Sequence, residues 1–91
     1  MDLEFVIFNL EFCLMILYIY NIRGTLYEGE CRSTTAPTEA GEITILENHV
    51  PLMTALMKGS LTYAKGTEKK EMDIEGGFLY TDGKKTTVLI R

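Results

Sequence analysis

The feature that most constrains the fold is a series of short apolar or alternating segments between residues 15 and 91, separated by turn-forming residues. Segments of four to eight residues with a period of two are typical of β-strands, and no segment keeps the 3.6-residue period of a helix. The pattern predicts an all-β domain, a flattened sandwich or barrel of short antiparallel strands. The clearest segments are 15–20, 25–35, 43–46, 60–65, 70–75, 77–81 and 86–91.

Two pairs of these segments are predicted to form hairpins. Residues 77–81 and 86–91 flank the Asp82-Gly83 pair, which supplies the positive φ angles that a tight primed turn requires. Residues 60–65 and 70–75 flank a polar tip in the same way. The turns therefore place each of these strands beside its neighbour in the chain.

The middle of the chain gives less uniform patterns. Residues 25–35 alternate, with Cys31 and Ser33 on one side and Glu30, Arg32 and Thr34 on the other, which is typical of a half-exposed strand. We expect residues 36–42 to form a loop and residues 43–46 a buried strand. Residues 51–57 fit either a strand or a helix that begins at Pro51.

Composition restricts the class of protein. Ninety-one residues fit one domain, and a hydrophobic content of 46% is enough for a modest core. The cysteines Cys13 and Cys31 are too few for a disulfide framework, which favours a reducing compartment. A net charge of −4 leaves no basic surface for a phosphate backbone, so we expect no nucleic-acid partner.

The first residues are strongly apolar. Residues 3–22 approach the composition of a membrane span, but Glu4, Asn9 and Glu11 lie within them. A charged residue near the centre of a spanning helix costs roughly 2.5 to 3.5 kcal/mol. An acidic start without a small-residue cleavage site also argues against a secretory signal.

Four stretches of the chain carry a family resemblance. They are TLYEGECRS, APTEAGEITIL, HVPLMTALMKGSL and EGGFLY, in this order between residues 25 and 80. They resemble the GEV, LPTEDGEIGIL, HxPLxxxLxxG and SGGFLEV segments of the N-terminal β-sandwich domain of the epsilon subunit of F-type ATP synthase. The corresponding mitochondrial chain is called delta. The resemblance covers residues 15–91.

The chain departs from the family pattern at several turns. Ile22 and Lys58 replace frequent prolines, and Glu47-Asn48-His49 stands where the family often has PGH. Asn tolerates a left-handed backbone better than most residues, so we expect the turn to persist. Residues with expected turn roles are Asn48, His49, Pro51, Gly76 and Gly77.

The chain is poor in catalytic groups. Its single histidine, His49, could act as a base beside Glu42 or Glu47, but a lone histidine after a turn is more often structural. The sequence contains no His and Cys cluster with metal-ligand spacing and no phosphate-binding glycine loop. We therefore expect a non-catalytic protein without a metal or cofactor.

The resemblance implies a specific role. In the family the sandwich binds the gamma subunit on one side and the ring of c subunits below, and so couples proton transport to ATP synthesis. The loop expected to face the rotor ring contains Thr38, Glu39, Gly41 and Glu42. Such a chain would be peripheral, on the cytoplasmic side of the energy-transducing membrane, and would meet the membrane only through the complex.

Both ends of the chain carry expectations. The usual start of the family falls on Met15, so residues 1–14 are expected to be an extension or the product of a mis-assigned start. The chain stops at Arg91, where many relatives continue into an inhibitory helical hairpin, which we expect to be lacking here. The alternative function is a stand-alone β-sandwich adaptor associated with a membrane surface.

Overall fold

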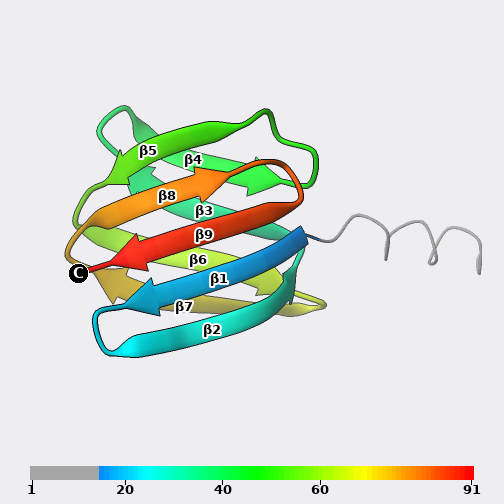
Figure 1. The fold of residues 1–91 in the computed structure, drawn as a ribbon, viewed down its shortest axis with the longest axis horizontal. Coiled ribbons are helices and arrows are strands. Elements are labelled where there is room, and N and C mark those ends of the chain that lie inside the picture. Colours follow the sequence, from blue (N-terminus) through cyan, green and yellow to red (C-terminus); the bar gives the residue numbers. More distant parts are fainter. Residues whose placement is uncertain (1–14) are drawn as a thin grey trace, which may run out of the picture.

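The computed structural model describes residues 15–91, and the expected extension at residues 1–14 lies outside them. The described residues are built from strands and turns, which confirms the all-β prediction (Figure 1). The strands are β1 (Met15–Asn21), β2 (Gly24–Cys31), β3 (Ser33–Thr38), β4 (Gly41–Leu46), β5 (Leu52–Leu56), β6 (Gly59–Lys65), β7 (Glu68–Ile74), β8 (Gly77–Thr81) and β9 (Lys85–Ile90).

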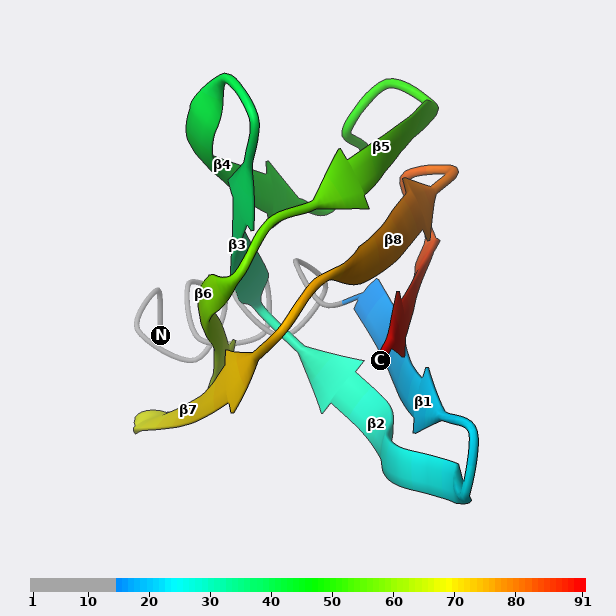
Figure 2. The same ribbon diagram turned by 90° about the vertical axis from the view of Figure 1, so that its left-hand side faces the viewer.

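The strands form two layers of one continuous sheet. The first layer has the order β2-β1-β9-β8-β5, and the second contains β4, β3, β6 and β7. Thr38 of β3 pairs with Leu56 of β5 where the layers join. Figure 2 shows the layers facing each other, with β3, β4 and β6 opposite β1, β8 and β9.

The core lies between the layers and follows from the period of two. In β1, Leu17 and Ile19 are fully buried, while the residues between and after them are only partly buried. Burying a side chain of this size contributes about 1.5 to 3 kcal/mol. The buried hydrophobic residues are Met15, Leu17, Ile19, Cys31, Ala36, Ile45, Leu56, Leu61, Tyr63, Ile74, Leu79 and Val88.

One strand pair departs from the expected antiparallel sheet. β1 and β9 run parallel, with Ile16 opposite Lys85 and Tyr20 opposite Leu89. The β8–β9 hairpin, which does form as predicted, brings β9 to lie beside β1. Turn residues determine how neighbouring strands pair, whereas this contact joins strands about 70 residues apart in the chain, so no local pattern could reveal its direction.

The single strand expected over residues 25–35 is wrong. The chain bends at Arg32 and passes from the first layer to the second, so β2 and β3 are separate strands. The bend changes the alternation, and both Cys31 and Thr34 are buried, with Sγ and Oγ1 3.4 Å apart. Thr34 was expected on the exposed side.

The segment after the bend is more regular than expected. Residues 36–38 belong to β3, so the predicted loop over 36–42 is reduced to a tight turn. β4 is hydrogen-bonded to β3. Ile45 is buried but Leu46 is 54% exposed, so the prediction of a buried strand is wrong for the residues of β4 that point outward. The ambiguous residues 51–57 form β5, a strand.

The turn at residues 82–84 differs from the primed turn that was expected. Both predicted hairpins are confirmed, but only Gly83 has a positive φ, of 94°. Asp82 stabilises the turn through its side chain, because Oδ1 accepts the backbone N–H groups of Lys85 at 2.8 Å and Lys84 at 2.9 Å. These two bonds, that of Lys85 first, hold the pKa of Asp82 below its ordinary value.

Gly77 is the position where a side chain is least acceptable. Its φ is 153°, and a Cβ there would lie 2.9 Å from Ile90 Cα and closer still to the carbonyl oxygen of Leu89. The missing side chain lets β8 pair with β9 at this end of the first layer.

We predict that Gly77→Ala destabilises the fold by about 2 kcal/mol more than Gly24→Ala. Gly24 is a matched control, because its φ is 138° and a Cβ there would have no neighbour within 4 Å. Both substitutions strain the backbone, but only the first adds a clash. Urea unfolding of the two variants measures the difference, and equal losses would contradict the clash.

The stability of the fold is predicted to depend on pH through Asp82. Its unfolded carboxyl has the ordinary pKa of 3.8 and its folded carboxyl a lower one, so the unfolded state takes up protons first as pH falls. The contribution of Asp82 is therefore complete above about pH 5 and is lost as pH falls through the folded pKa. Asp82→Asn keeps an acceptor oxygen that does not titrate. Denaturation from pH 6 down to pH 2.5 should show a shallower loss for this variant, and parallel curves would exclude the role of Asp82.

Candidate partner-binding surfaces

The corner after β4 contains the only histidine of the chain. Asn48 has a φ of 66° and donates its N–H to the Gly83 carbonyl at 2.8 Å. His49 donates its N–H to the Leu46 carbonyl at 3.1 Å, and its Nδ1 lies 2.7 Å from the Val50 carbonyl. Because a carbonyl only accepts, Nδ1 carries the proton and the ring is hydrogen-bonded within the corner.

The positions of Glu42 and Glu47 argue against the carboxylate-paired general base that the sequence suggested at His49. Glu42 lies near the start of β4, whereas His49 follows the turn after the end of this strand, so most of the length of β4 separates them. Within residues 15–91, no hydrogen bond or ion pair joins His49 to Glu47. The two pairings that would have activated the ring are therefore not formed.

The four residues expected to face a rotor ring gather on the β3–β4 turn. Thr38 Oγ1 donates to the Gly41 carbonyl at 2.6 Å and accepts the Ala40 N–H at 3.2 Å, so the threonine holds the turn together. Glu39, Gly41 and Glu42 are exposed. We call Thr38–Glu42 the acidic tip, and it presents two carboxylates on a short, hydrogen-bonded turn.

The remaining predicted turn residues lie elsewhere. Pro51 is exposed just before β5. Gly76, with a φ of 144°, accepts the Arg91 N–H through its carbonyl at 3.1 Å, and Gly77 follows it into β8. The corner at Asn48 and His49 is packed against the β8–β9 turn, because a Cβ on Gly83 would lie 2.7 Å from the His49 carbonyl oxygen.

An exposed apolar surface covers the outside of the first layer. This layer lies toward the viewer in Figure 1. The pairings place Phe78 beside Leu89 and Tyr80 beside Met53, and these four side chains are 57%, 51%, 45% and 72% exposed. Tyr18 and Tyr20 continue the surface onto β1. We call this the apolar face, made of Tyr18, Tyr20, Met53, Phe78, Tyr80 and Leu89.

Sequence reasoning did not locate the apolar face. Its signature is present in the stretches MILYIY and GFLY, which are apolar at nearly every position and so leave apolar side chains on both sides of a strand. Only the register shows that these outward side chains come together on one surface.

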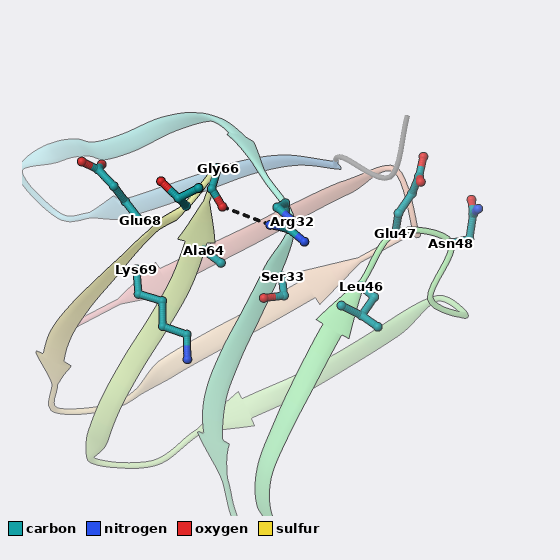
Figure 3. Close-up of a pocket in the computed structure, with 10 residues that line it drawn as sticks. Arg32, Ser33, Leu46, Glu47, Asn48, Ala64, Gly66, Glu68 and Lys69 are labelled. Atoms are coloured by element: carbon teal, nitrogen blue, oxygen red, sulfur yellow. Dashed lines mark hydrogen bonds between the residues drawn. The ribbon is translucent and has the colours of Figure 1, made fainter. Parts of the chain in front are cut away.

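An open hollow of about 620 Å³ lies on the outside of the second layer (Figure 3). Its floor is a cross-strand row of Leu46, Ser33 and Ala64. At its rim, Arg32 Nη1 donates to the Gly66 carbonyl at 3.1 Å. Side chains of both charge signs line it, namely Arg32, Glu47, Glu68 and Lys69.

The described residues show little that could carry out chemistry. Burial raises the pKa of the Cys31 thiol, against smaller lowering by bonds with Thr34 and Ser33, and this keeps the sulfur protonated near neutral pH. Residues 15–91 contain no group of three His, Cys, Asp or Glu side chains that could hold a metal ion. Cys13 lies outside the described residues. In the same range, no helix is long and apolar enough to cross a membrane.

Comparison with known families agrees with the resemblance in the sequence. The family model of the ATP synthase Delta/Epsilon chain, beta-sandwich domain, matches residues 14–91. The chain belongs to this family.

This delta/epsilon-type chain is similar to a curated relative and to chains of two solved structures. The ATP synthase epsilon chain of Dichelobacter nodosus is 35% identical over 74 residues, which cover 80% of this chain and 52% of the relative. A chain of the Euglena gracilis mitochondrial ATP synthase, solved with its c-ring, has a TM-score of 0.80 at 21% identity, covering 86% of this chain and 51% of that one.

The second solved structure shows the same fold. It is a chain from the central stalk and c-ring of the Tetrahymena thermophila mitochondrial ATP synthase, with a TM-score of 0.71 at 15% identity. The alignment covers 84% of the present chain and 62% of that one. The delta/epsilon-type chain thus spans about half the length of the Dichelobacter relative and somewhat more of the Tetrahymena chain.

The corner yields a prediction at Asn48. A left-handed backbone costs a residue with a Cβ about 1 kcal/mol or more, less for Asn and none for Gly. We expect Asn48→Ala to lower the free energy of unfolding by about 1 kcal/mol, and Asn48→Gly to change it by less than about 0.5 kcal/mol. Glu47→Ala is the control, since Glu47 does not have a positive φ. Thermal unfolding compares the three, and a larger loss for Gly than for Ala would contradict this reading.

Proposed function

We propose that this chain is a non-catalytic central-stalk subunit of an F-type ATP synthase, in which the sandwich joins the gamma subunit to the ring of c subunits. In this role it couples proton transport to ATP synthesis. The observation that carries the proposal is the apolar face of the first layer, together with membership of the family.

The apolar face is the proposed gamma-binding surface. Single exposed apolar residues are ordinary, but a contiguous group with aromatic side chains is typical of an interaction site. Tyr, Phe and Met are enriched in the centres of protein interfaces. Because the cross-strand pairings run unbroken from β5 to β1, the surface is a firm platform rather than a loop.

The acidic tip is the proposed contact with the c ring. Glu39 and Glu42 can accept charge-assisted hydrogen bonds from arginine or amide groups, which fix register and orientation more than they add affinity. The Thr38 bonds hold the carboxylates on a short turn, so little conformational freedom would be lost on contact.

The proposed role requires a stiff domain and no catalytic chemistry. Close-packed interiors compress little and transmit strain, which suits a body held between moving partners. The buried, protonated Cys31 thiol is a poor nucleophile, which supports a non-catalytic role. We place the chain as a peripheral protein on the cytoplasmic side of the energy-transducing membrane, attached through the complex.

The apolar face is tested by Phe78→Ser combined with Leu89→Ser. We expect this variant to fold and to bind the cognate gamma subunit at least about tenfold more weakly, because central aromatic and aliphatic anchors dominate binding energy. The matched control is Leu46→Ser, which removes an equally exposed side chain from the outside of the second layer. Calorimetric titration with gamma measures affinity, and circular dichroism checks the fold.

Binding of gamma that is unchanged in the double variant would refute the proposed surface. Wild-type chain that binds anionic vesicles but not gamma would instead support a membrane-surface adaptor.

The acidic tip is tested in the same system. Glu39→Gln with Glu42→Gln should leave gamma binding intact and weaken capture of the gamma-bound chain by the c ring. Glu68→Gln with Glu71→Gln makes the same charge change on β7 and should affect neither.

A further inference from the structure

The edge of the apolar face next to β2 combines two tyrosines with a carboxylate. Tyr18 and Tyr20 are two positions apart on β1, so they point to the same side, and their rings are stacked with centroids 5.9 Å apart and planes inclined by 11°. Glu28 of β2 lies directly opposite Tyr18 in the antiparallel register. Side chains in such a pair start about 5 Å apart on the same face of the sheet.

The Glu28 carboxylate has no basic partner within residues 15–91. The salt bridges of these residues join Lys58 to Glu75 and Lys70 to Glu68, away from β2. Glu28 is exposed, and the two tyrosine side chains beside it are half-buried. An aromatic platform therefore borders an uncompensated negative charge at the rim of an apolar surface.

We propose that Tyr18, Tyr20 and Glu28 form a docking site for one arginine side chain of the partner that covers the apolar face. The inference rests on the proposed function, which makes that partner the gamma subunit. The guanidinium plane would stack on a tyrosine ring, and its N–H groups would donate to the Glu28 carboxylate.

Several physical reasons favour arginine for this position. A guanidinium is planar, can stack face to face on an aromatic ring and forms bidentate hydrogen bonds with a carboxylate. An ammonium can also lie over an aromatic ring, but it binds a carboxylate as a point charge without the bidentate geometry. Arginine and tyrosine are also among the residues most enriched at binding hot spots. Burial of the neighbouring apolar face would exclude water and strengthen both contacts.

The chain already contains a related contact. Lys65 Nζ lies 5.9 Å from the centroid of the Tyr27 ring, also on β2. The Tyr18 and Tyr20 platform differs because no cation of residues 15–91 lies over it.

Glu30 provides the control that distinguishes a specific arginine site from general electrostatic attraction. Glu30 is exposed on the same strand and face, two residues from Glu28, but it lies opposite Ile16 and has no tyrosine across from it. Glu28→Gln and Glu30→Gln therefore remove the same charge from neighbouring positions, and only the first removes it from the aromatic platform.

The test is calorimetric titration of the full chain with the cognate gamma subunit between 50 and 300 mM salt, about the range in which surface charges become screened. Glu28→Gln is expected to weaken binding about tenfold at low salt and to flatten its salt dependence, while Glu30→Gln changes affinity by less than about twofold. Tyr18→Phe should retain affinity because it keeps the ring face. Tyr18→Leu should lose about as much as Glu28→Gln.

Equal effects of Glu28→Gln and Glu30→Gln, or no effect of Glu28→Gln, would overturn the arginine site. So would a loss on Tyr18→Phe as large as that on Tyr18→Leu, because a hydroxyl contact would then explain the binding. These outcomes leave the proposed function standing as long as Phe78→Ser with Leu89→Ser still weakens binding of gamma. Normal binding by that double variant would refute the apolar face as the gamma-binding surface, and a wild-type chain that fails to bind gamma would remove the proposed function itself.

Discussion

The two layers of this chain share one narrow interior, and almost every strand must give alternate side chains to it. Leu17 and Ile19 from the first layer and Ile45 and Leu61 from the second are fully buried there. Because successive side chains of a strand point to opposite faces, the residue next to each buried one points outward. The residues at these alternate positions therefore determine the composition of the outer faces. The outside of the first layer is apolar and aromatic, whereas that of the second combines polar and charged side chains with the exposed Leu46.

The local features of the fold could be predicted from the sequence. Hairpins depend on turn residues and on strand period within about fifteen residues, and both predicted hairpins form. The family motifs pointed to the same fold. Asp82 illustrates the limit of local reasoning, because the turn was located correctly but its stabilisation comes from a side chain that accepts two backbone N–H groups rather than from two positive φ angles.

The predictions that failed concern features that depend on contacts between distant parts of the chain. The bend at Arg32 is required because β2 and β3 lie in different layers, and nothing in the alternation of residues 25–35 shows that change. The parallel pairing of β1 with β9 is likewise set by the whole topology. The apolar face has the same origin: Met53, Phe78 and Leu89 come from three strands, and only their register unites them.

The positions of the acidic tip and the apolar face give the proposed coupling a direct mechanical route. Thr38, at the base of the tip, pairs with Leu56 at the end of β5, and the Met57 N–H donates to the Pro37 carbonyl at 2.9 Å. β5 carries Met53 and pairs with β8, which carries Phe78 and Tyr80. A displacement of the tip is therefore passed to the apolar face through hydrogen-bonded strands, with no flexible linker between them. Since close-packed interiors compress little and transmit strain, the two proposed partners would be joined through the packed sheet and not through a loop.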